Sequence, residues 1–457
     1  MIHFPPGPQA PSFVQFWQWT YRPVEFMDTC ALRFGDWFTV RLPGNRKFVL
    51  TSDPSAIKDV FSANPDHLSA AEFNKILKPM IGGKSLIVID GADHSRVRTH
   101  AAQPFYSERM HSYGAVMKGM TTRAIQRWAS GPPFALHPEM QHLTLDIMMN
   151  AMFGSNAETR LAILREKLTE ILLLTSSPAR LFIFGNNGDL PLPKIQRALG
   201  GFSPWGKVLK LLEHVDRILY DEIQARRQKP AEYNDILSML IRSHEDREKS
   251  FDKKEIRDQI MTLLIAGHEI TAGALAWIFC RLISHPDVLE SLLGEVKAKS
   301  DCDGIDLRQI EHLSYLEAVI YETLRLNPVI PVVGRYLKKP MRLGGYDLPA
   351  GAYVVPCIYL IHRRKDIWPD PERFNPGRFI GRRWSPWEFF PFGGGADRCL
   401  GTAFAIYEMK IIIAQILHCV KLDCAPGYAV KAVRRGITLV PSEGMPVIVK
   451  NVKKADF

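Results

Sequence analysis

The segment Phe392-Gly-Gly-Gly-Ala-Asp-Arg-Cys399-Leu-Gly401 decides the fold of this chain. Its cysteine follows a phenylalanine by seven residues, with three consecutive glycines between them, and stands just before a helical pattern from Thr402 to Cys419. Glycine lets the backbone approach a ligand closely. Amide groups at the start of a helix stabilise a thiolate, and they also tune a metal that the sulfur binds. The segment therefore predicts that Cys399 is a metal-binding thiolate.

Two simpler readings of this glycine-rich segment compete with a metal site. A phosphate-binding loop would follow the spacing G-x-x-x-x-G-K-S/T or G-x-G-x-x-G, and the segment follows neither. A single cysteine, in contrast, is most often a small buried apolar residue. The segment alone leaves that second reading open, so motifs elsewhere in the chain have to decide.

The segment resembles the cysteine loop that binds haem iron in the cytochrome P450 superfamily. The resemblance implies that Cys399 is the axial thiolate ligand of haem b, and that Phe392, Gly393 and Gly401 bind the same cofactor. It extends over nearly the whole chain, because further motifs follow in the order of the family. It implies a mainly α, triangular-prism fold with small β-sheets.

The pattern along the chain favours a single haem domain over residues 1–457. Although 457 residues are enough for two or three domains, no Pro/Gly/Ser-rich linker separates two halves. Helical periodicity dominates residues 90–326 and 402–420. Short strands are expected in three stretches rich in β-branched and aromatic residues, 37–51, 334–356 and 436–450. The hydrophobic content of 46% and the charged content of 23% are those of a globular protein.

The formal net charge of +10 comes from 58 basic and 48 acidic residues. Basic clusters at 363–365, 382–383 and 431–435 contribute to it, and such a surface attracts an acidic protein or anionic lipid. No recognition module or aromatic–basic stacking pattern for nucleic acid is present in the sequence. We therefore expect an acidic protein partner, at most peripheral contact with a membrane, and no nucleic acid.

The seven cysteines are odd in number, scattered and without a C-x-x-C pair. This distribution argues against a disulfide framework or a zinc site and indicates a reducing compartment. Neither a signal peptide nor a transmembrane segment is recognisable around the proline-rich stretch Pro5-Pro6-Gly7-Pro8. We expect a cytoplasmic, bacterial and monomeric enzyme.

An apolar helix is expected over residues 252–284, and its centre reads Ala266-Gly267-His268-Glu269-Ile270-Thr271. The residues alone are equally consistent with a kinked core helix whose Glu269 faces outward, because a buried carboxylate is costly unless it is paired or wet. The stretch resembles the oxygen-binding helix of the family, A/G-G-x-D/E-T-T/S. On this resemblance Ala266 and Gly267 flank the oxygen pocket, and Glu269 is the acid that relays protons.

Ile270 occupies the position that the family fills with threonine. Thr271 follows one step later, about 100° further round the helix, so it cannot simply take the same place. Isoleucine has no group that donates a hydrogen bond. The resemblance therefore implies that a water molecule or a substrate hydroxyl helps to deliver protons, or that oxygen activation is poorly coupled to product formation.

An E-x-x-R motif at Glu322 and Arg325 lies on a helix expected over residues 314–326. Residues three apart share a helix face. In the family this pair joins a later arginine in a buried structural network, for which the bidentate geometry of arginine is suited. Arg373, in the string P-E-R-F, and Arg378, in the frame F-x-P-x-R-F, are both candidates, and the longer frame favours Arg378. Surface ion pairs are the alternative reading.

His94 and Arg98 stand at the spacing i and i+4, so that both project from one helix face. An isolated histidine–arginine pair of this kind more often lies on a solvated helix face. The family's H-x-x-x-R motif at this place binds a haem propionate, and Arg335 matches another propionate-binding arginine. Asp397 stands where the family usually has arginine or histidine. Repulsion from a propionate would be about 1–4 kcal/mol, so we expect Asp397 to turn away, to cap the following turn or to pair with an arginine.

The substrate pocket is expected, from the family, to be lined by three apolar stretches, which suit a lipid-like substrate. Each of their members is equally well explained as an ordinary core residue. The stretches are Phe73, Ile76 and Leu86, then Leu181, Phe182 and Ile183, then Val332 and Val333.

The resemblance implies a monooxygenase that inserts one oxygen atom of O2 into a C–H bond of a hydrophobic small molecule, such as a fatty acid or terpenoid. Electrons would come from a separate ferredoxin or flavodoxin with its reductase. Glu408-Met-Lys410 and the Ala-Gly-His-Glu core resemble the bacterial branch close to microsomal-type enzymes. Alternatives are a haem-thiolate isomerase or dehydratase that needs no external electrons, and a non-catalytic haem-binding sensor. A peroxide-driven enzyme would carry Arg-Pro in place of Glu269-Ile270.

Overall fold

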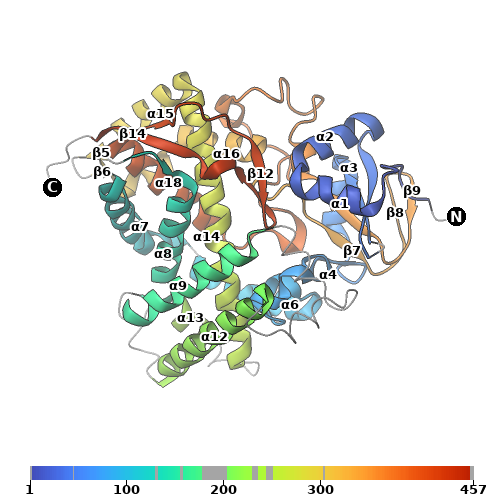
Figure 1. Cartoon of the computed structure of the whole chain (residues 1–457), viewed down its shortest axis with the longest axis horizontal. Coiled ribbons are helices and arrows are strands. Elements are labelled where there is room, and N and C mark those ends of the chain that lie inside the picture. Colours follow the sequence, from blue (N-terminus) through green and yellow to red (C-terminus); the bar gives the residue numbers. More distant parts are fainter. Residues whose placement is uncertain are drawn as a thin grey trace.

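Helices form most of the molecule, and small sheets lie around them (Figure 1). This computed structural model describes residues 3–44, 46–105, 107–128, 132–154, 158–177, 203–228, 235–242, 251–301 and 304–452. The architecture confirms the predicted class, mainly α with small sheets.

The helices are long in the middle of the chain and short near its two sheet-forming regions. They are α1 (Ser12–Tyr21), α2 (Pro23–Phe34), α3 (Pro54–Ser62), α4 (Ala70–Asn74), α5 (Lys78–Ile81), α6 (Gly91–Ala101), α7 (Ser107–Trp128), α8 (Leu136–Phe153), α9 (Glu158–Thr175), α12 (Pro204–Gln228), α13 (Ile236–Arg242), α14 (Lys253–Ser284), α15 (Pro286–Ala298), α16 (Ser314–Leu326), α17 (Ile358–Ile361) and α18 (Thr402–Cys419).

The largest sheet combines strands from both ends of the chain, in the order β1-β2-β10-β7-β3. Its strands are β1 (Trp37–Leu42), β2 (Arg46–Thr51), β3 (Leu68–Ser69), β7 (Arg335–Leu337) and β10 (Tyr353–Pro356). β10 runs parallel to β2, whereas β1 with β2 and β7 with β10 are antiparallel. This sheet and α1 to α3 form one end of the molecule (Figure 1).

The remaining strands form one three-stranded sheet and three two-stranded sheets in the described parts of the chain. β11 (Val420–Cys424), β14 (Pro446–Val452) and β4 (Phe134–Ala135) make up the three-stranded sheet. The antiparallel pairs are β5 (Ser300–Asp301) with β6 (Gly304–Ile305), β8 (Met341–Leu343) with β9 (Tyr346–Leu348), and β12 (Ala432–Arg435) with β13 (Thr438–Pro441).

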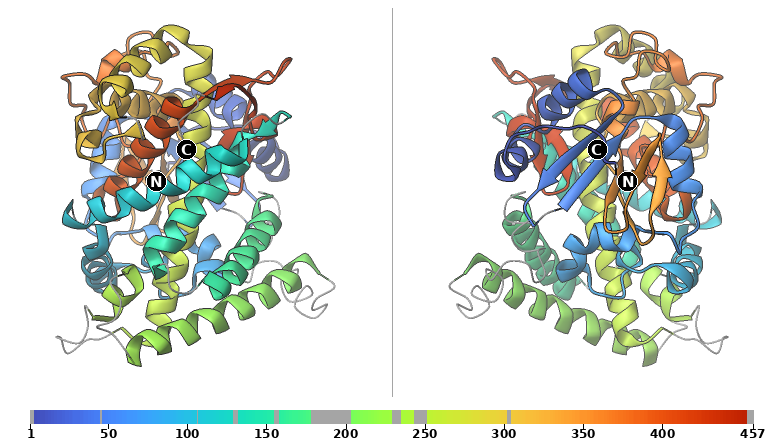
Figure 2. Two further views of the ribbon diagram at one scale, coloured as in Figure 1. Left: turned by 90° about the vertical axis from the view of Figure 1, so that its left-hand side faces the viewer. Right: turned by 90° about the vertical axis from the view of Figure 1, so that its right-hand side faces the viewer.

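α14 is the central element, and α12 crosses near its first turns (Figure 2). Asp252 caps its N-terminus through the Glu255 amide, and the Glu255 carboxylate accepts a hydrogen bond from the Asp252 amide in return. Such a capping box satisfies amides that a helix start otherwise leaves unpaired. Most of α14 is buried in the main hydrophobic core, where it packs against α8, α16 and α18. It therefore provides a fixed wall for whatever lies beside it.

Two helices, α14 and α18, are long and apolar enough to cross a membrane by length and composition. Their most apolar windows are 67% and 78% buried inside the molecule, respectively. Helices at the core of a globular protein carry the same apolar composition, so the packing seen here accounts for it.

The helix predictions agree with the structure more closely than the strand predictions. α16 and α18 begin and end at the predicted residues, and α14 starts one residue after the predicted Asp252, which is its cap. The strand expected from Gly436 begins only at Thr438. Gly436 has a φ of +58° and belongs to the turn between β12 and β13, a conformation that favours glycine over a strand.

Candidate functional site

The cysteine loop is a tight turn that depends on its glycines. Gly393 and Gly395 have φ values of +71° and +69°, which side chains rarely tolerate. A Cβ on Gly394 would lie 2.4 Å from the ring of Phe61, so this position has no room for a side chain. The Cys399 amide then donates to the Phe392 carbonyl over 2.9 Å and closes the turn. The three glycines thus hold the cysteine at the start of α18.

The sulfur of Cys399 is surrounded by hydrogen-bond donors and positive charge. Cys399 is accessible, although burial of its surroundings raises the pKa of its thiol, as expected for a residue on the wall of an internal hollow. Four neighbouring groups act against this shift and lower the pKa of the thiol. They are the Gly401 amide, the Thr402 hydroxyl and two arginines, Arg98 and Arg398. A bound metal would complete the shift to the thiolate. No disulfide joins the described cysteines.

One face of α14 is half-buried in the middle of the helix. Ala266 and Ile270, four residues apart, lie on this face and are only partly covered by protein. Gly267 is partly covered too, but the space beside its Cα belongs to α8, because a Cβ there would lie 2.4 Å from Cε of Met148. The glycine is therefore explained by helix packing.

Glu269 points into a polar cluster formed with α8 and β12. It accepts a hydrogen bond from Nε2 of Gln141, and its second oxygen lies 3.4 Å from Nε of Arg435. Its side chain is only 15% exposed, so the structure disagrees with the alternative reading of an outward-facing carboxylate. Thr271 is buried and donates to the Gly267 carbonyl over 3.1 Å. Its hydroxyl is thus occupied within the helix.

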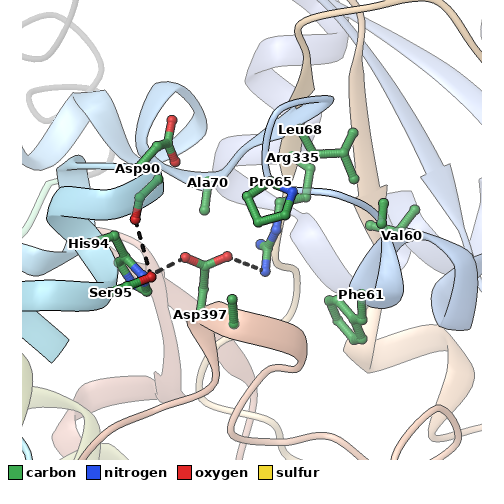
Figure 3. A pocket seen from close by; sticks show the side chains of 13 residues that line it. Val60, Phe61, Pro65, Leu68, Ala70, Asp90, His94, Ser95, Arg335 and Asp397 are labelled. Carbon is green, nitrogen blue, oxygen red and sulfur yellow. Dashed lines mark hydrogen bonds and ion pairs between the residues drawn. The ribbon is translucent and has the colours of Figure 1, made fainter. Parts of the chain in front are cut away.

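Asp397 lies between two of the predicted propionate-binding residues (Figure 3). One carboxylate oxygen is 2.8 Å from Nη2 of Arg335, and the other is 3.4 Å from Nε2 of His94. Burial lowers the pKa of both basic groups, and the Asp397 charge acts against that shift. Arg98 donates to the Arg398 carbonyl over 2.7 Å and thus holds the cysteine loop. Of the three outcomes expected for Asp397, the structure has pairing with an arginine.

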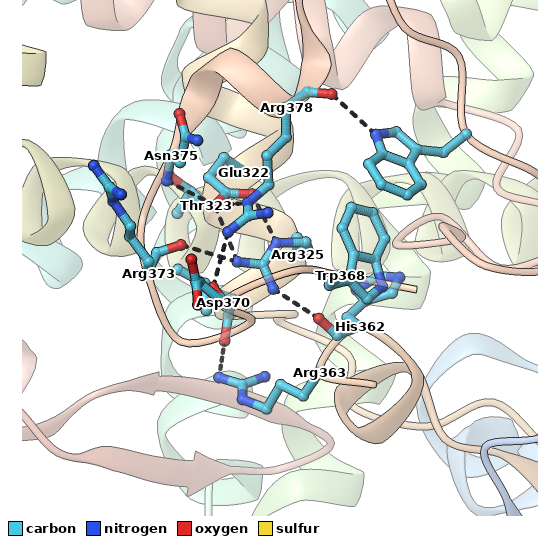
Figure 4. A network of polar contacts seen from close by, with 12 residues as sticks. Glu322, Thr323, Arg325, His362, Arg363, Trp368, Asp370, Arg373, Asn375 and Arg378 are labelled. Atoms are coloured by element: carbon cyan, nitrogen blue, oxygen red, sulfur yellow. Dashed lines mark hydrogen bonds and ion pairs between the residues drawn. The ribbon is translucent and has the colours of Figure 1, made fainter. Parts of the chain in front are cut away.

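The E-x-x-R pair is fully buried and lies at the centre of a polar network (Figure 4). Arg325 binds both carboxylate oxygens of Glu322 at 2.7 and 3.0 Å. Nε of Arg378 lies 3.4 Å from the same carboxylate, whereas Arg373 contributes only its carbonyl oxygen to Arg325. Arg325 also donates to the His362 carbonyl over 2.7 Å. The network therefore fastens α16 to the chain that leads to the cysteine loop.

Comparison with known proteins decides the family. The cytochrome P450 family model matches residues 5–447. The chain belongs to the cytochrome P450 family. Cytochrome P450 135B1 of Mycobacterium tuberculosis is 34% identical over 450 residues, which cover 98% of this chain and 91% of that protein. Cytochrome P450 138 of the same organism is 32% identical over 98% of this chain and 97% of its own.

Solved structures of cytochromes P450 share the fold. The retinoic acid-bound cyanobacterial CYP120A1 superposes with a TM-score of 0.84 at 24% identity, over 99% of this chain and 100% of that one. The haem domain of cytochrome P450DA gives a TM-score of 0.85 at 20% identity, over 100% and 99% of the two chains. At these identities the likeness establishes the fold alone, and it confirms the expected cytochrome P450 fold.

The family implies a haem-thiolate cofactor, and the residues of this chain fit it with one exception. Cys399 offers an accessible sulfur with donors around it. A Cβ on Gly401 would meet nothing within 4 Å, which leaves room for a flat group against the start of α18. His94 and Arg335 supply a ring nitrogen and a guanidinium that can hold carboxylates. The exception is Asp397, because its carboxylate already contacts both of these groups.

A cavity of about 250 Å³ extends between the cysteine loop and α1. Four of the predicted pocket residues line it, Phe73, Ile76, Val332 and Val333. Leu86 does not belong to its described lining and packs instead against the main core. Leu181, Phe182 and Ile183 lie outside the described residues.

Sequence reasoning missed the part of this cavity wall that comes from α1 and the β12–β13 turn. Phe16 and Trp19 of α1, together with Arg434 and Ile437, line the cavity. The aromatic residues at 13, 16, 17 and 19 in the first helix were a signal in the sequence. Their positions in space could not be predicted, because β12 pairs with β13 and reaches α1 from more than 400 residues away, as the bond from Arg434 to the Trp19 carbonyl shows.

Proposed function

We propose that this cytochrome P450 oxidises a hydrophobic small molecule of the fatty acid, terpenoid or related lipid class. One oxygen atom of O2 would enter a C–H bond, and the other would leave as water with two electrons and two protons. The observation that carries the proposal is the apolar cavity that opens on the cysteine loop. Apolar walls with few polar groups select apolar ligands and exclude water. We also assign the chain to the bacterial branch close to microsomal-type enzymes.

The haem, when bound, supplies the oxygen chemistry. Cys399 would bind the haem iron, and the Gly401 amide and the Thr402 hydroxyl would stabilise its sulfur. His94, Arg98 and Arg335 would hold the propionates, and Phe392, Gly393 and Gly401 would pack against the macrocycle. Glu322, Arg325 and Arg378 would keep the loop in place for the cofactor. The whole of residues 1–457 is proposed as one haem domain.

Glu269 would move protons toward the half-buried face of α14. A second cavity of about 120 Å³ lies beside it, lined among others by Gln141, His142, His268 and Arg435. Of these groups the imidazoles can exchange protons on the path to the Glu269 carboxylate, whereas Ile270 can donate none. We therefore propose that water or a substrate hydroxyl takes over the last step of proton delivery. The proton would arrive at a part of α14 whose form depends on its small and polar residues. These are Ala266, Gly267 and Thr271.

Electrons would reach the cysteine loop from a separate ferredoxin or flavodoxin with its reductase, docking on a monomeric, cytoplasmic protein. Arg382, Arg383 and Arg398 are exposed, and Arg398 stands next to Cys399. Arg363 and Arg364, in contrast, are paired with acids of this chain and offer less charge to a partner. An acidic partner steered by exposed arginines binds more slowly as salt increases. Turnover that is independent of ionic strength would argue against this docking mode.

The absorption spectrum of the reduced, carbon monoxide-bound protein tests the proposed function. A thiolate-shifted Soret band is expected, because Cys399 would supply the thiolate that binds the iron. Turnover of lipid-like substrates with a surrogate ferredoxin and reductase should then yield hydroxylated product in proportion to the reductant consumed. A spectrum without the shifted band would reject Cys399 as the ligand, and a normal band without turnover would favour a sensor.

A haem-thiolate isomerase or dehydratase is the second candidate, and the geometry at α14 is compatible with it. Ile270 cannot donate a hydrogen bond, and the Thr271 hydroxyl is already bonded to the Gly267 carbonyl. A reaction without external electrons needs no proton delivery to O2. Product formed from a peroxidised or epoxidised lipid in the absence of any reductant would support this candidate over the monooxygenase.

A further inference from the structure

Arg434 lies on the wall of the apolar cavity, and no carboxylate among the described residues forms an ion pair with it. The cavity runs from Gly393 and Gly394 of the cysteine loop to Phe16 and Trp19 of α1, where Arg434 lies. Most of its lining is aliphatic or aromatic. A charge at such a wall is costly unless it is paired.

The contacts of Arg434 leave most of its guanidinium unused. Nε donates to the Trp19 carbonyl over 3.1 Å, and the guanidinium carbon lies 5.0 Å from the centre of the Trp19 ring. Nη2 is shielded from solvent and has no hydrogen-bond partner in the described part of the chain. Burial lowers the pKa of Arg434 to about 10, and no carboxylate counteracts this shift. A ligand with a negative charge would supply the missing partner.

Other buried arginines show how this chain ordinarily pairs such a charge. Arg335 lines the same cavity and lies 2.8 Å from Asp397. Arg325 is bound by Glu322 at 2.7 Å. Arg435, the neighbour of Arg434 on β12, lies 3.4 Å from Glu269. Arg434 thus differs from these three in lacking an internal acid.

We propose that Arg434 binds the carboxylate of an acidic, otherwise apolar substrate. Nε is bonded to the Trp19 carbonyl and Nη2 has no partner among the described residues, so the Nη end of the guanidinium is the part that a carboxylate would bind. The proposal rests on the monooxygenase function above and names its substrate class, a long-chain carboxylic acid. It also sets the position of oxidation. With the carboxylate held at α1, the apolar end of the acid lies away from Arg434, so oxygen would enter a C–H bond remote from the carboxylate.

The test compares an acid with its own methyl ester on the oxidised holoenzyme. Dodecanoic acid and methyl dodecanoate share the apolar chain, and their dissociation constants are read from the shift of the Soret band on titration. We expect the acid to bind at least tenfold more tightly than the ester, because a carboxylate makes charge-assisted hydrogen bonds with the guanidinium. Arg434→Gln should abolish this difference, and Arg434→Lys should retain part of it. Lys431→Gln removes one charge from an exposed position just before the same strand and should leave the ratio unchanged.

The outcomes separate this proposal from the proposed function. The reduced carbon monoxide spectrum is recorded for each variant first. A wild-type protein without the thiolate-shifted band would overturn the function itself. Two results would overturn only the role of Arg434, provided that the protein shows the thiolate-shifted band. One is equal binding of acid and ester by the wild type. The other is an unchanged preference for the acid in Arg434→Gln. Should Arg434→Gln fail to fold, the wild-type ratio and the Arg434→Lys ratio still decide. With active enzyme, hydroxylation next to the carboxylate instead of near the apolar end would contradict the proposed orientation.

Discussion

Replacing Asp397 by asparagine should strengthen the retention of haem. In the structure the Asp397 carboxylate lies 2.8 Å from Arg335 and 3.4 Å from His94, the residues proposed to hold a propionate. A propionate must share these cations with the aspartate and is also repelled by it. Asparagine keeps the size of the side chain and removes the charge, so both penalties should fall.

The size of this effect follows from the separation and exposure of the charges. Two unit charges 4 Å apart interact by about 1 kcal/mol in bulk water and about 4 kcal/mol at an effective dielectric constant of 20. The Asp397 side chain is 29% exposed and therefore lies between these limits. We expect a gain of about 1–3 kcal/mol in haem binding, which is roughly a 5- to 150-fold decrease in the dissociation constant.

Transfer of haem to an excess of apomyoglobin measures this quantity independently of catalysis. Haem should leave the Asp397→Asn protein more slowly than it leaves the wild type. Asp93→Asn is the matched control, because Asp93 lies on α6 next to His94 but its side chain is 71% exposed. Arg335→Gln should cost more haem affinity in the Asp397→Asn background than in the wild type, since Asp397 no longer neutralises Arg335. Equal or faster haem loss from Asp397→Asn would refute the reasoning and make Asp397 a residue that positions the two cations.

Three further changes test other parts of the site. Ile270→Thr should raise the yield of product per reductant consumed by restoring a donor on the open face of α14, and an unchanged yield would remove the significance of Ile270. Arg325→Leu should abolish haem incorporation, measured as the haem-to-protein ratio, because an unpaired buried Glu322 costs about 3–5 kcal/mol. The pKa of His137 is lowered from 6.5 to about 4, mainly by burial. The unfolded chain therefore takes up a proton below pH 6.5 that the folded one refuses, so the free energy of unfolding in urea should fall by up to about 3 kcal/mol between pH 6.5 and 4, with a shallower decline in His137→Gln.

The core helices could be predicted from the sequence because their signals are local. α16 and α18 follow from apolar periodicity together with Pro328 and Gly401 at their ends, and α14 from its long apolar run after the capping residue Asp252. The pairing of β2 with β10 could not be predicted in this way, because it joins residues 305 positions apart. Short strands carry few residues, so tertiary contacts decide their limits.

The site could be predicted where several residues share one motif. The E-x-x-R pair, its third member Arg378 and the cysteine turn were all named from the sequence, and the structure brings Glu322, Arg325 and Arg378 into one network. The partner of Asp397 was left open among three outcomes, because Arg335 and His94 approach it from different elements. The role of Arg434 was invisible, since a cluster of basic residues in a sequence reads as a solvated surface until packing shows which member is buried.

The two arginines at the end of β12, Arg434 and Arg435, face different parts of the site. Neighbouring residues of a strand point to opposite faces, and accordingly Arg435 pairs with Glu269 while Arg434 turns to Trp19 and the apolar cavity. A change at Arg434 thus alters the cavity without removing the ion pair of the proposed proton relay. For this reason Arg434→Gln should lose acid binding but keep the coupling of reductant consumption to product formation on a neutral substrate. This result would assign the two arginines to different tasks. A simultaneous loss of coupling would instead mean that the β12–β13 pair responds as one unit.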